Sequence, residues 1–317
     1  MINSVRNTVL SVLNKNNYGY ISPADFNLYA KQAQLEIYSE YFSNYNKTVT
    51  MENMRRSSSD YADLGQALAE TMEYFLTSNF LIKSTTNNFF IPSITTTGDE
   101  AYMVSRLSVY TTLIITSTNT TVLAGSLVDS AANFTTLGVQ VGDIVSNAAT
   151  NQVATVVSVT SSTSLVLTQN IFPSAGVSYF IYSAANVKDL EKVSSGKITM
   201  LNNSMLTAPS LLFPAYTQEN DVYRAYPAAI SNPGQVQAVY FRYPLDPKWT
   251  YVTLLGGEPS FDQSQPDYQD FEMPAEDEFK LITKILQYCG VSIREAQVTQ
   301  FAAAKEQREQ PTFSQQQ

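Results

Sequence analysis

The spacing of hydrophobic positions predicts two helices at the start of the chain. Residues 2–13 carry apolar side chains at helical spacing, namely Ile2, Val5, Val9 and Leu13. Ser22-Pro23-Ala24-Asp25 then supplies an N-cap serine, a proline at the first helical position and an acid in the first turn. We therefore expect a helix from Pro23 to about Tyr45. Its apolar residues lie on more than one side, so it needs more than one neighbour, either in the core or in another subunit.

Mixed elements follow this helix. A Ser-rich loop is expected at Met51–Ser59, and a second helical pattern runs from Asp60 to Leu76. Asn87–Pro92 has the composition of an extended edge segment, and Tyr102–Tyr110 alternates as a strand does.

The middle of the chain changes to short β-branched runs separated by Gly, Asn and Ser clusters. These runs are Ile144-Val145, Val153–Val159, Leu165–Leu167 and Tyr179–Tyr182. Their spacing predicts a small antiparallel barrel or sandwich. We expect residues 111–183 to form this β-module, inserted into an α+β body made of residues 1–110 and 184–317. Insertions are tolerated where their ends meet, so the two ends should lie close together.

After the module, Val187–Val193 is expected to hold one or two helical turns. Three aromatic and β-branched runs then predict strands, at Phe213–Tyr216, Val222–Tyr226 and Val236–Tyr243. A pair of capped helices is expected to close the body. They span about Glu276–Tyr288, ending at Gly290, and Ile293–Gln307. The Gln-rich residues 311–317 predict a disordered tail.

Composition narrows the possible functions. The chain has 317 residues, of which 15% are charged, a net charge of −9 and a pI near 4.6. Sequence-independent binding of nucleic acid needs clustered Lys and Arg, so the composition disfavours this function. Histidine is absent and there is one cysteine, which disfavours the commonest general base and excludes an intrachain disulfide. We find no 18-residue apolar run and no signal-peptide pattern, so a soluble, non-exported protein is expected.

The acidic segment Glu258–Glu278 is the main place where chemistry could occur. It holds eight acids and no Lys or Arg, and three prolines interrupt it. The carboxylates that could pair as in a glycosidase, or bind calcium, are Asp262, Asp267, Asp270 and Glu272. Their spacing lacks the D-x-D-x-DG calcium pattern. The plainer interpretation is an acidic loop that packs on a neighbour, and we expect no catalytic, cofactor-binding or metal-binding residues.

Four other positions have structural interpretations. Cys289 has no histidine to activate it and is expected to be an inert buried thiol. Gly256-Gly257 lacks the following Lys of a phosphate loop. Asp143 is expected to cap a turn by accepting backbone N–H groups. The single tryptophan, Trp249, is expected in a core or an interface.

In the acidic segment Glu258–Glu278, apolar side chains occur at irregular spacing among the acids, which suggests a strap laid across a neighbouring surface. The aromatic and Met side chains would fill pockets, and the acids would set the register. The interface residues expected from this pattern and from the long helix are Phe26, Ile37, Tyr41, Trp249, Phe261, Tyr268, Phe271 and Met273.

An ordered set of motifs resembles structural proteins of crAss-like gut bacteriophages. The set lies on both flanks, over about residues 15–80 and 210–305. It comprises Gly19–Asn27, Ala33–Ile37, Tyr41–Tyr45, Phe213–Tyr216, Tyr243–Trp249, Gln269–Pro274, Ile285–Gly290 and Ile293–Glu295. The proteins that it resembles are ring components of the head-to-tail connector, stacked beneath the portal. The insert from about Tyr110 to Ser183 departs from the shorter members and resembles small β-modules of phage structural proteins.

The resemblance implies a homo-oligomeric ring, twelvefold to match the portal, at the portal vertex or tail of the virion. Its expected partners are the portal protein and neighbouring connector or tail rings, and before assembly it would reside in the host cytoplasm. DNA would pass through the lumen without specific binding, and no membrane is involved. Two other classes remain open. One is a tail or fibre adhesin that binds host glycan through the β-module, and the other is a tail-associated glycan hydrolase.

Overall fold

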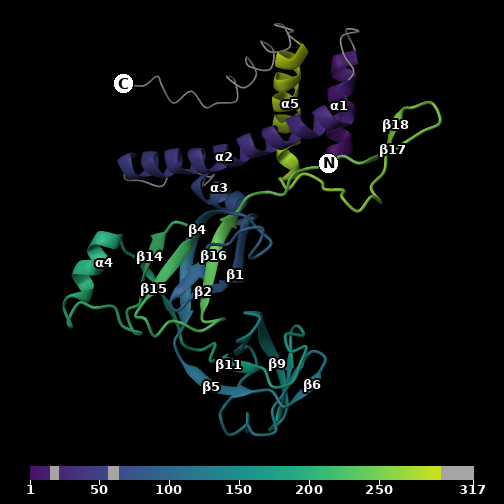
Figure 1. Cartoon of the computed structure of the whole chain (residues 1–317). Coiled ribbons are helices and arrows are strands. Elements are labelled where there is room, and N and C mark those ends of the chain that lie inside the picture. The colour runs from purple at the N-terminus through teal and green to yellow at the C-terminus, as the bar shows by residue number, and fades with distance from the viewer. Residues whose placement is uncertain (15–20, 56–63, 294–317) are drawn as a thin grey trace. The chain divides into compact units, whose positions relative to one another are not determined.

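The computed structural model describes residues 1–14, 21–55 and 64–293, and it confirms a mixed α+β fold (Figure 1). The chain divides into two compact units. The first unit joins Met1–Phe75 to Tyr243–Gln317, and the second is continuous from Leu76 to Arg242. The second unit therefore contains both the inserted β-module and the strands that flank it.

The first unit is built from helices. Their bounds are α1 Ile2–Asn14, α2 Pro23–Arg55, α3 Leu64–Glu73 and α5 Glu278–Ile293, and a short 3₁₀ turn, η1 Ala275–Asp277, precedes α5. Helix α5 packs against both α1 and α2, and α3 packs against α2. The buried side chains of α2 and α5 include Phe26, Ala33, Ile37, Leu281 and Ile285. Because α2 has α5 and α3 as neighbours, most of its apolar residues are covered within the same chain, although Leu28 stays exposed.

The start of α2 is confirmed and its expected end is wrong. Ser22 Oγ accepts the N–H of Asp25 at 3.1 Å and donates to the Asp25 carboxylate at 2.6 Å, as an N-cap does. The helix continues to Arg55, into the segment that was expected to be a loop. No glycine or proline interrupts residues 24–55, so nothing in the backbone ends the helix at Tyr45.

Helix α5 also extends beyond its expected end. It continues through Gly290 to Ile293, because a single glycine lowers helix stability without breaking the hydrogen-bonding pattern. The expected last helix, Ile293–Gln307, and the expected tail at 311–317 lie outside the described residues.

Two strands of the first unit form a hairpin, β17 Tyr251–Thr253 with β18 Pro259–Phe261. It projects from the helices of its unit (Figure 1). Gly257 has a φ of +82° in the connecting loop, a conformation that glycine adopts without strain. The acidic segment was expected to lack regular structure, yet its first residues pair in β18.

The second unit contains a sandwich of a four-stranded and a five-stranded sheet. The strand orders are β1-β16-β4-β12 and β13-β14-β15-β3-β2. The bounds are β1 Leu76–Phe80, β2 Lys83–Thr85, β3 Asn88–Phe90, β4 Ala101–Tyr110, β12 Val187–Asp189, β13 Glu191–Lys192, β14 Ala215–Glu219, β15 Val222–Tyr226 and β16 Val236–Arg242. One core cluster unites buried side chains of both sheets, among them Leu107, Ala238, Tyr240, Phe89 and Tyr223.

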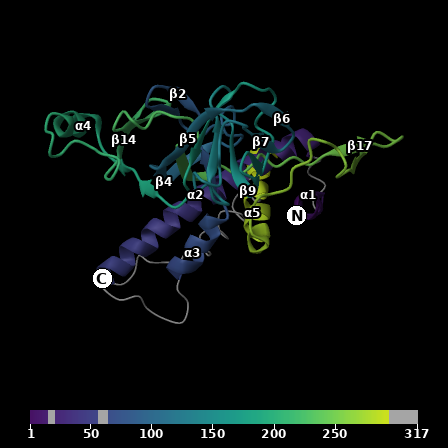
Figure 2. The same ribbon diagram turned by 90° about the horizontal axis from the view of Figure 1, so that it is seen from below.

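The helical turns expected at Val187–Val193 are wrong. Val187 and Asp189 lie in β12, which pairs with β4, so pairing with a distant strand overrides the local pattern. The helix begins later, as α4 Ser195–Asn202, with the Ser194 side chain accepting the N–H of Lys197. Helix α4 packs on β14 at the outside of the sandwich (Figure 2).

The β-module is one seven-stranded antiparallel sheet in the order β5-β11-β8-β9-β10-β7-β6. The bounds are β5 Leu113–Thr118, β6 Thr121–Leu123, β7 Ser126–Val128, β8 Ile144–Asn147, β9 Val153–Ser161, β10 Ser164–Leu167 and β11 Ser178–Tyr182. The sheet does not close into a barrel among the described strands. Its edge strands β5 and β6 are joined by only Asn119 and Thr120, so the sheet must curl strongly to bring its two edges together.

The ends of the module meet, as expected. Tyr110 pairs with Val187, the N–H of Thr111 bonds Asn186 O at 3.2 Å, and Ser183 bonds Thr112 O at 3.0 Å. Asp143 is confirmed as a turn cap, because its carboxylate accepts the N–H of Gln140 at 2.7 Å. It also accepts the N–H of Ala184 at 3.0 Å and so ties the turn to the exit of the module.

The module rests on the sandwich through a small contact. Tyr182 OH accepts from Asn232 Nδ2 at 2.6 Å, and a cluster around Tyr110, Ile144 and Tyr182 is buried between them. Gly234 has a φ of +71°, and a Cβ built there would lie 2.6 Å from Ser146 Cβ. The close approach of the two backbones therefore requires glycine at this position.

Candidate interaction surfaces

The acidic segment folds back on its own unit. Phe271 and Met273 are buried there, and Phe261 and Tyr268 are half-buried with ring centroids 5.9 Å apart. The N–H of Lys248 bonds Gln269 O at 2.8 Å in an isolated antiparallel bridge, which holds the segment beside the residues that precede β17. A strap does exist, but it lies across its own subunit.

Trp249 is the centre of this arrangement and is 2% exposed. Its ring stacks on Tyr251 and Phe261, with centroids 5.6 and 5.9 Å away. The guanidinium of Arg6 lies 3.8 Å from the ring centroid, a cation–π contact. The indole N–H donates to Asn3 Oδ1 at 3.1 Å. One side chain thus joins α1, the hairpin and the acidic segment.

Asp270 holds the first residues of the chain. Its carboxylate accepts from the Met1 amine at 2.9 Å and from the N–H of Ile2 at 2.7 Å. Burial raises the pKa of Asp270, but the bonds from the amine and from the N–H groups of Ile2 and Phe271 outweigh it, and the net shift is downward. The carboxylate also sits at the positive end of α1, where a negative charge is favoured.

Asp270→Asn is expected to lower the free energy of unfolding of the first unit by about 1 kcal/mol at neutral pH, because the pair is partly exposed and screened. The folded pKa is below the ordinary value of 3.8, so the stabilisation is present above pH 4 and is lost as pH falls through the folded pKa. Urea unfolding of both proteins from pH 7 to pH 3 should show the difference shrinking towards acid.

Asp246→Asn is the matched control, since Asp246 pairs with Lys31 on the surface with both side chains largely exposed. It should change stability by less than about 0.5 kcal/mol. A difference between wild type and Asp270→Asn that stayed constant down to pH 3 would contradict the role given to the carboxylate.

The other acids of the segment have partners of their own. Asp262 accepts from Ser264 and Gln265, Asp267 pairs with Lys248, and Glu272 accepts the N–H of Leu245 at 2.8 Å. Hydrogen bonds lower the pKa of Asp262 and Asp267. A glycosidase acid needs the opposite shift, because it must hold its proton near neutral pH. Within the described residues, no group of three or more His, Cys, Asp or Glu side chains could hold a metal ion.

A second polar network joins α2 to α5. Lys284 is almost fully buried and contacts Glu36 at 2.9 Å and Glu40 at 2.8 Å. Tyr41 donates to Asp277, and burial together with this carboxylate raises the pKa of the phenol far above its usual value. These contacts join the two helices, because the buried Lys284 ammonium needs a charged partner, which the partly exposed glutamates supply.

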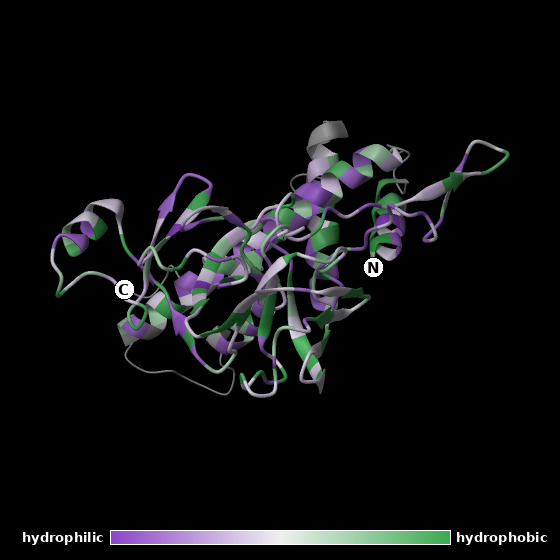
Figure 3. Cartoon of the chain, turned by 60° about the horizontal axis from the view of Figure 1, so that its bottom comes forward, coloured by the Kyte–Doolittle hydropathy of each residue, from purple (hydrophilic) through white to green (hydrophobic). Residues whose placement is uncertain are grey.

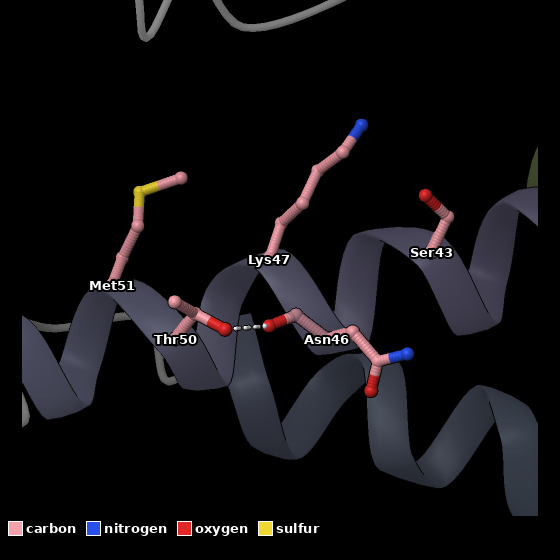
Figure 4. A pocket seen from close by; sticks show the side chains of 5 residues that line it. All are labelled: Ser43, Asn46, Lys47, Thr50 and Met51. Carbon is pink, nitrogen blue, oxygen red and sulfur yellow. Dashed lines mark hydrogen bonds between the residues drawn. The ribbon is translucent and has the colours of Figure 1, made fainter.

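Cys289 lies on α5 and is fully buried, as expected. Burial raises the pKa of its thiol to about 12, so the reactive thiolate is scarce at neutral pH. The depression lined by Ser43, Asn46, Lys47, Thr50 and Met51 is a single face of α2 (Figure 4). Its lining side chains, as far as the structure describes the chain, all come from this one helix, and a ligand pocket normally encloses its ligand from several sides.

The eight residues expected at an interface are mostly internal. Phe261 and Tyr268 are half-buried, and the other six are buried, namely Phe26, Ile37, Tyr41, Trp249, Phe271 and Met273. Their own unit already covers them. At an interface, other and more exposed residues of the same elements would therefore have to contact the neighbouring subunit. That role stays a prediction.

Sequence reasoning missed two segments that expose several large apolar side chains. The first, which we call the arm, is Ser195–Phe213 in the second unit, and the second is the hairpin of β17 and β18 (Figure 3). The exposed apolar side chains of the arm are Met200, Met205, Leu206, Leu211, Leu212 and Phe213. Those of the hairpin are Tyr251, Val252, Leu254 and Leu255. A signal was present in the sequence, since residues 198–218 carry no charge.

No helix among the described residues is long and apolar enough to cross a membrane. No protein-family model matches the chain, and no curated protein matches it in sequence.

Proposed function

We propose that this chain is a virion structural protein that forms an oligomeric ring in the portal–tail connector of a phage. The first support is the resemblance of its motifs to connector ring proteins of crAss-like phages. The proposed neighbours are the portal protein and adjacent connector or tail rings. The proposed setting is the portal vertex of the virion, reached from the host cytoplasm during assembly.

The observation that carries the proposal is that motifs far apart in the sequence are hydrogen-bonded to one another in the first unit. Asn27, at the end of the first motif, bonds the backbone of Trp249 twice, at 2.9 and 3.2 Å. Gln34, in the second motif, donates to Leu245 O at 2.8 Å and accepts the N–H of Glu272 at 3.2 Å. Two N-terminal motifs thus bind two C-terminal ones within the first unit, whereas the motif Phe213–Tyr216 lies in the second unit.

The surface also favours a protein that works inside an assembly. The arm and the hairpin expose large apolar side chains, including Leu206 at 97% and Phe213 at 75%. Monomeric soluble proteins rarely expose such clustered apolar surface, and where it occurs it marks interaction sites. A ring is the proposed form because repeated heterologous contacts between identical subunits can close on themselves.

The charge balance suits passage of DNA. The chain has 19 basic and 28 acidic residues, so a lumen sharing that balance would repel the phosphate backbone. DNA would then slide through the ring without specific binding. A dodecamer is the proposed copy number, since it would match the symmetry of a portal.

Negative-stain microscopy and mass photometry of the concentrated protein, alone and with its portal, should show closed rings of uniform mass. Elongated trimers would favour the alternative function, a tail or fibre adhesin that binds host glycan through the β-module. Because a portal can template assembly, the decisive observation is the virion itself. A single copy of the chain at the vertex, without a ring around the axis, would contradict the proposal.

A further inference from the structure

The arm is a preformed apolar projection. After α4, its backbone polar groups bond within the arm: Ser204 N to Leu201 O at 3.3 Å, Ala208 N to Ser204 O at 2.9 Å, and Phe213 N to Ser210 O at 3.1 Å. The Thr207 hydroxyl donates to Leu201 O at 3.1 Å. The arm therefore holds its shape while six large apolar side chains remain in water. Such preorganisation reduces the entropy that binding would cost.

The hairpin has the same character in the other unit. Leu254 N bonds Glu258 O at 2.9 Å and Gly257 N bonds Leu254 O at 2.8 Å, so its loop is also ordered by its own backbone. Leu254 and Leu255 stand at the tip, and Leu255 is fully exposed. A chain of 317 residues thus presents two ordered apolar surfaces on separate units.

The single charges within these two surfaces have opposite signs. The arm has one charged residue, Lys197, which is exposed near the start of α4. The hairpin has one, Glu258, also exposed, and Asp262 follows it directly. Apolar surfaces of two negatively charged copies can approach only if the local charges do not repel, and this pair attracts.

We propose that the arm of one copy packs against the hairpin of the next copy. The inference rests on the proposed ring, because it names the contact that would join neighbouring subunits. A membrane is the less favoured occupant, since the arm carries one basic residue and no tryptophan, and the chain is acidic overall. The contact is heterologous, so each copy uses its arm towards one neighbour and its hairpin towards the other.

Site-directed cross-linking tests the contact. Leu206→Cys and Leu255→Cys are made in two separately tagged full-length chains, which are mixed at assembly concentration and treated with a short bismaleimide. The native thiol does not compete, because Cys289 is buried and its pKa is raised to about 12. The expected product is a cross-linked pair that carries both tags. Ser158→Cys is the control, an exposed position on the module that should give no such pair with either partner.

The second part of the test introduces a negative charge into the arm. Leu206→Asp should weaken self-association at least about tenfold, as loss of a central apolar anchor does. Asn203→Asp adds the same charge to an exposed polar position of the arm and should leave self-association within about twofold. Circular dichroism should show the wild-type spectrum for both variants, because neither side chain is buried in the chain.

The outcomes separate the two proposals. Rings whose 206–255 cross-link does not exceed the Ser158 control would overturn this inference and leave the proposed function standing. Mixed-tag cross-links in open filaments without rings would support the contact and contradict the ring. A cross-link found only within one chain carrying both cysteines would overturn the contact, as would equal effects of Leu206→Asp and Asn203→Asp.

Discussion

Replacing Trp249 with alanine is expected to lower the free energy of unfolding of the first unit by about 3–5 kcal/mol, the usual cost of removing a buried large aromatic side chain. The substitution removes the ring that stacks on Tyr251 and Phe261 and covers the Arg6 guanidinium. It also leaves the Asn3 carboxamide without the indole N–H. The loss reaches α1, the hairpin and the acidic segment together, because all three meet at this side chain.

Far-UV circular dichroism during urea unfolding is the appropriate measurement. The variant lacks the only tryptophan, so fluorescence is not comparable, whereas the helical signal comes mainly from the first unit. Tyr251→Ala is the control in the same stack, because Tyr251 is 44% exposed, and it should cost about 1 kcal/mol or less. A loss below about 1 kcal/mol for Trp249→Ala would mean that the cluster is not the centre of the unit.

The second large effect is expected at Gly234 in the other unit. Gly234→Ala should destabilise the second unit by about 2–4 kcal/mol, because it adds left-handed backbone strain to overpacking. The new methyl group would lie 2.6 Å from Ser146 Cβ and 3.1 Å from Val153 Cγ2, and neither atom is the far end of a flexible side chain. The simplest relief is separation of the module from the sandwich.

Gly98→Ala isolates the strain from the clash. Gly98 has a φ of +87° in the same unit, but a Cβ there meets nothing within 4 Å, so only about 1 kcal/mol is expected. Hydrogen exchange of β8 and β16 should rise in Gly234→Ala alone, while Trp249 fluorescence, which reports the first unit, stays unchanged. Equal destabilisation by the two alanines would show that the close contact with Ser146 does not matter.

The features that sequence predicted well are those set by local chemistry. The serine cap and proline at the start of α2 depend on a few adjacent residues, and so do the alternating strands β9 and β11 of the module. Helix ends were predicted less well, because a glycine at position 290 or a polar stretch after Tyr45 does not by itself outweigh packing against another helix.

Features set by distant pairing were missed. Val187–Asp189 and Glu191–Lys192 have no clear strand pattern, yet β12 pairs with β4 and β13 pairs with β14. The strap was recognised from its irregular aromatic spacing, but the sequence could not indicate that its pockets lie in its own subunit. Whether a side chain such as Phe271 meets its own chain or a neighbour depends on tertiary contacts, which spacing does not encode.

The paired entrance and exit of the β-module have a consequence for how such chains can be altered. Thr111 and Asn186 are hydrogen-bonded neighbours at the end of two paired strands, and beside them the Asp143 carboxylate accepts the N–H of Ala184. The chain therefore enters and leaves the insert through two paired strands of the sandwich, β4 and β12. We therefore expect this site to accept, in place of residues 112–185, another domain whose own termini leave as a strand pair.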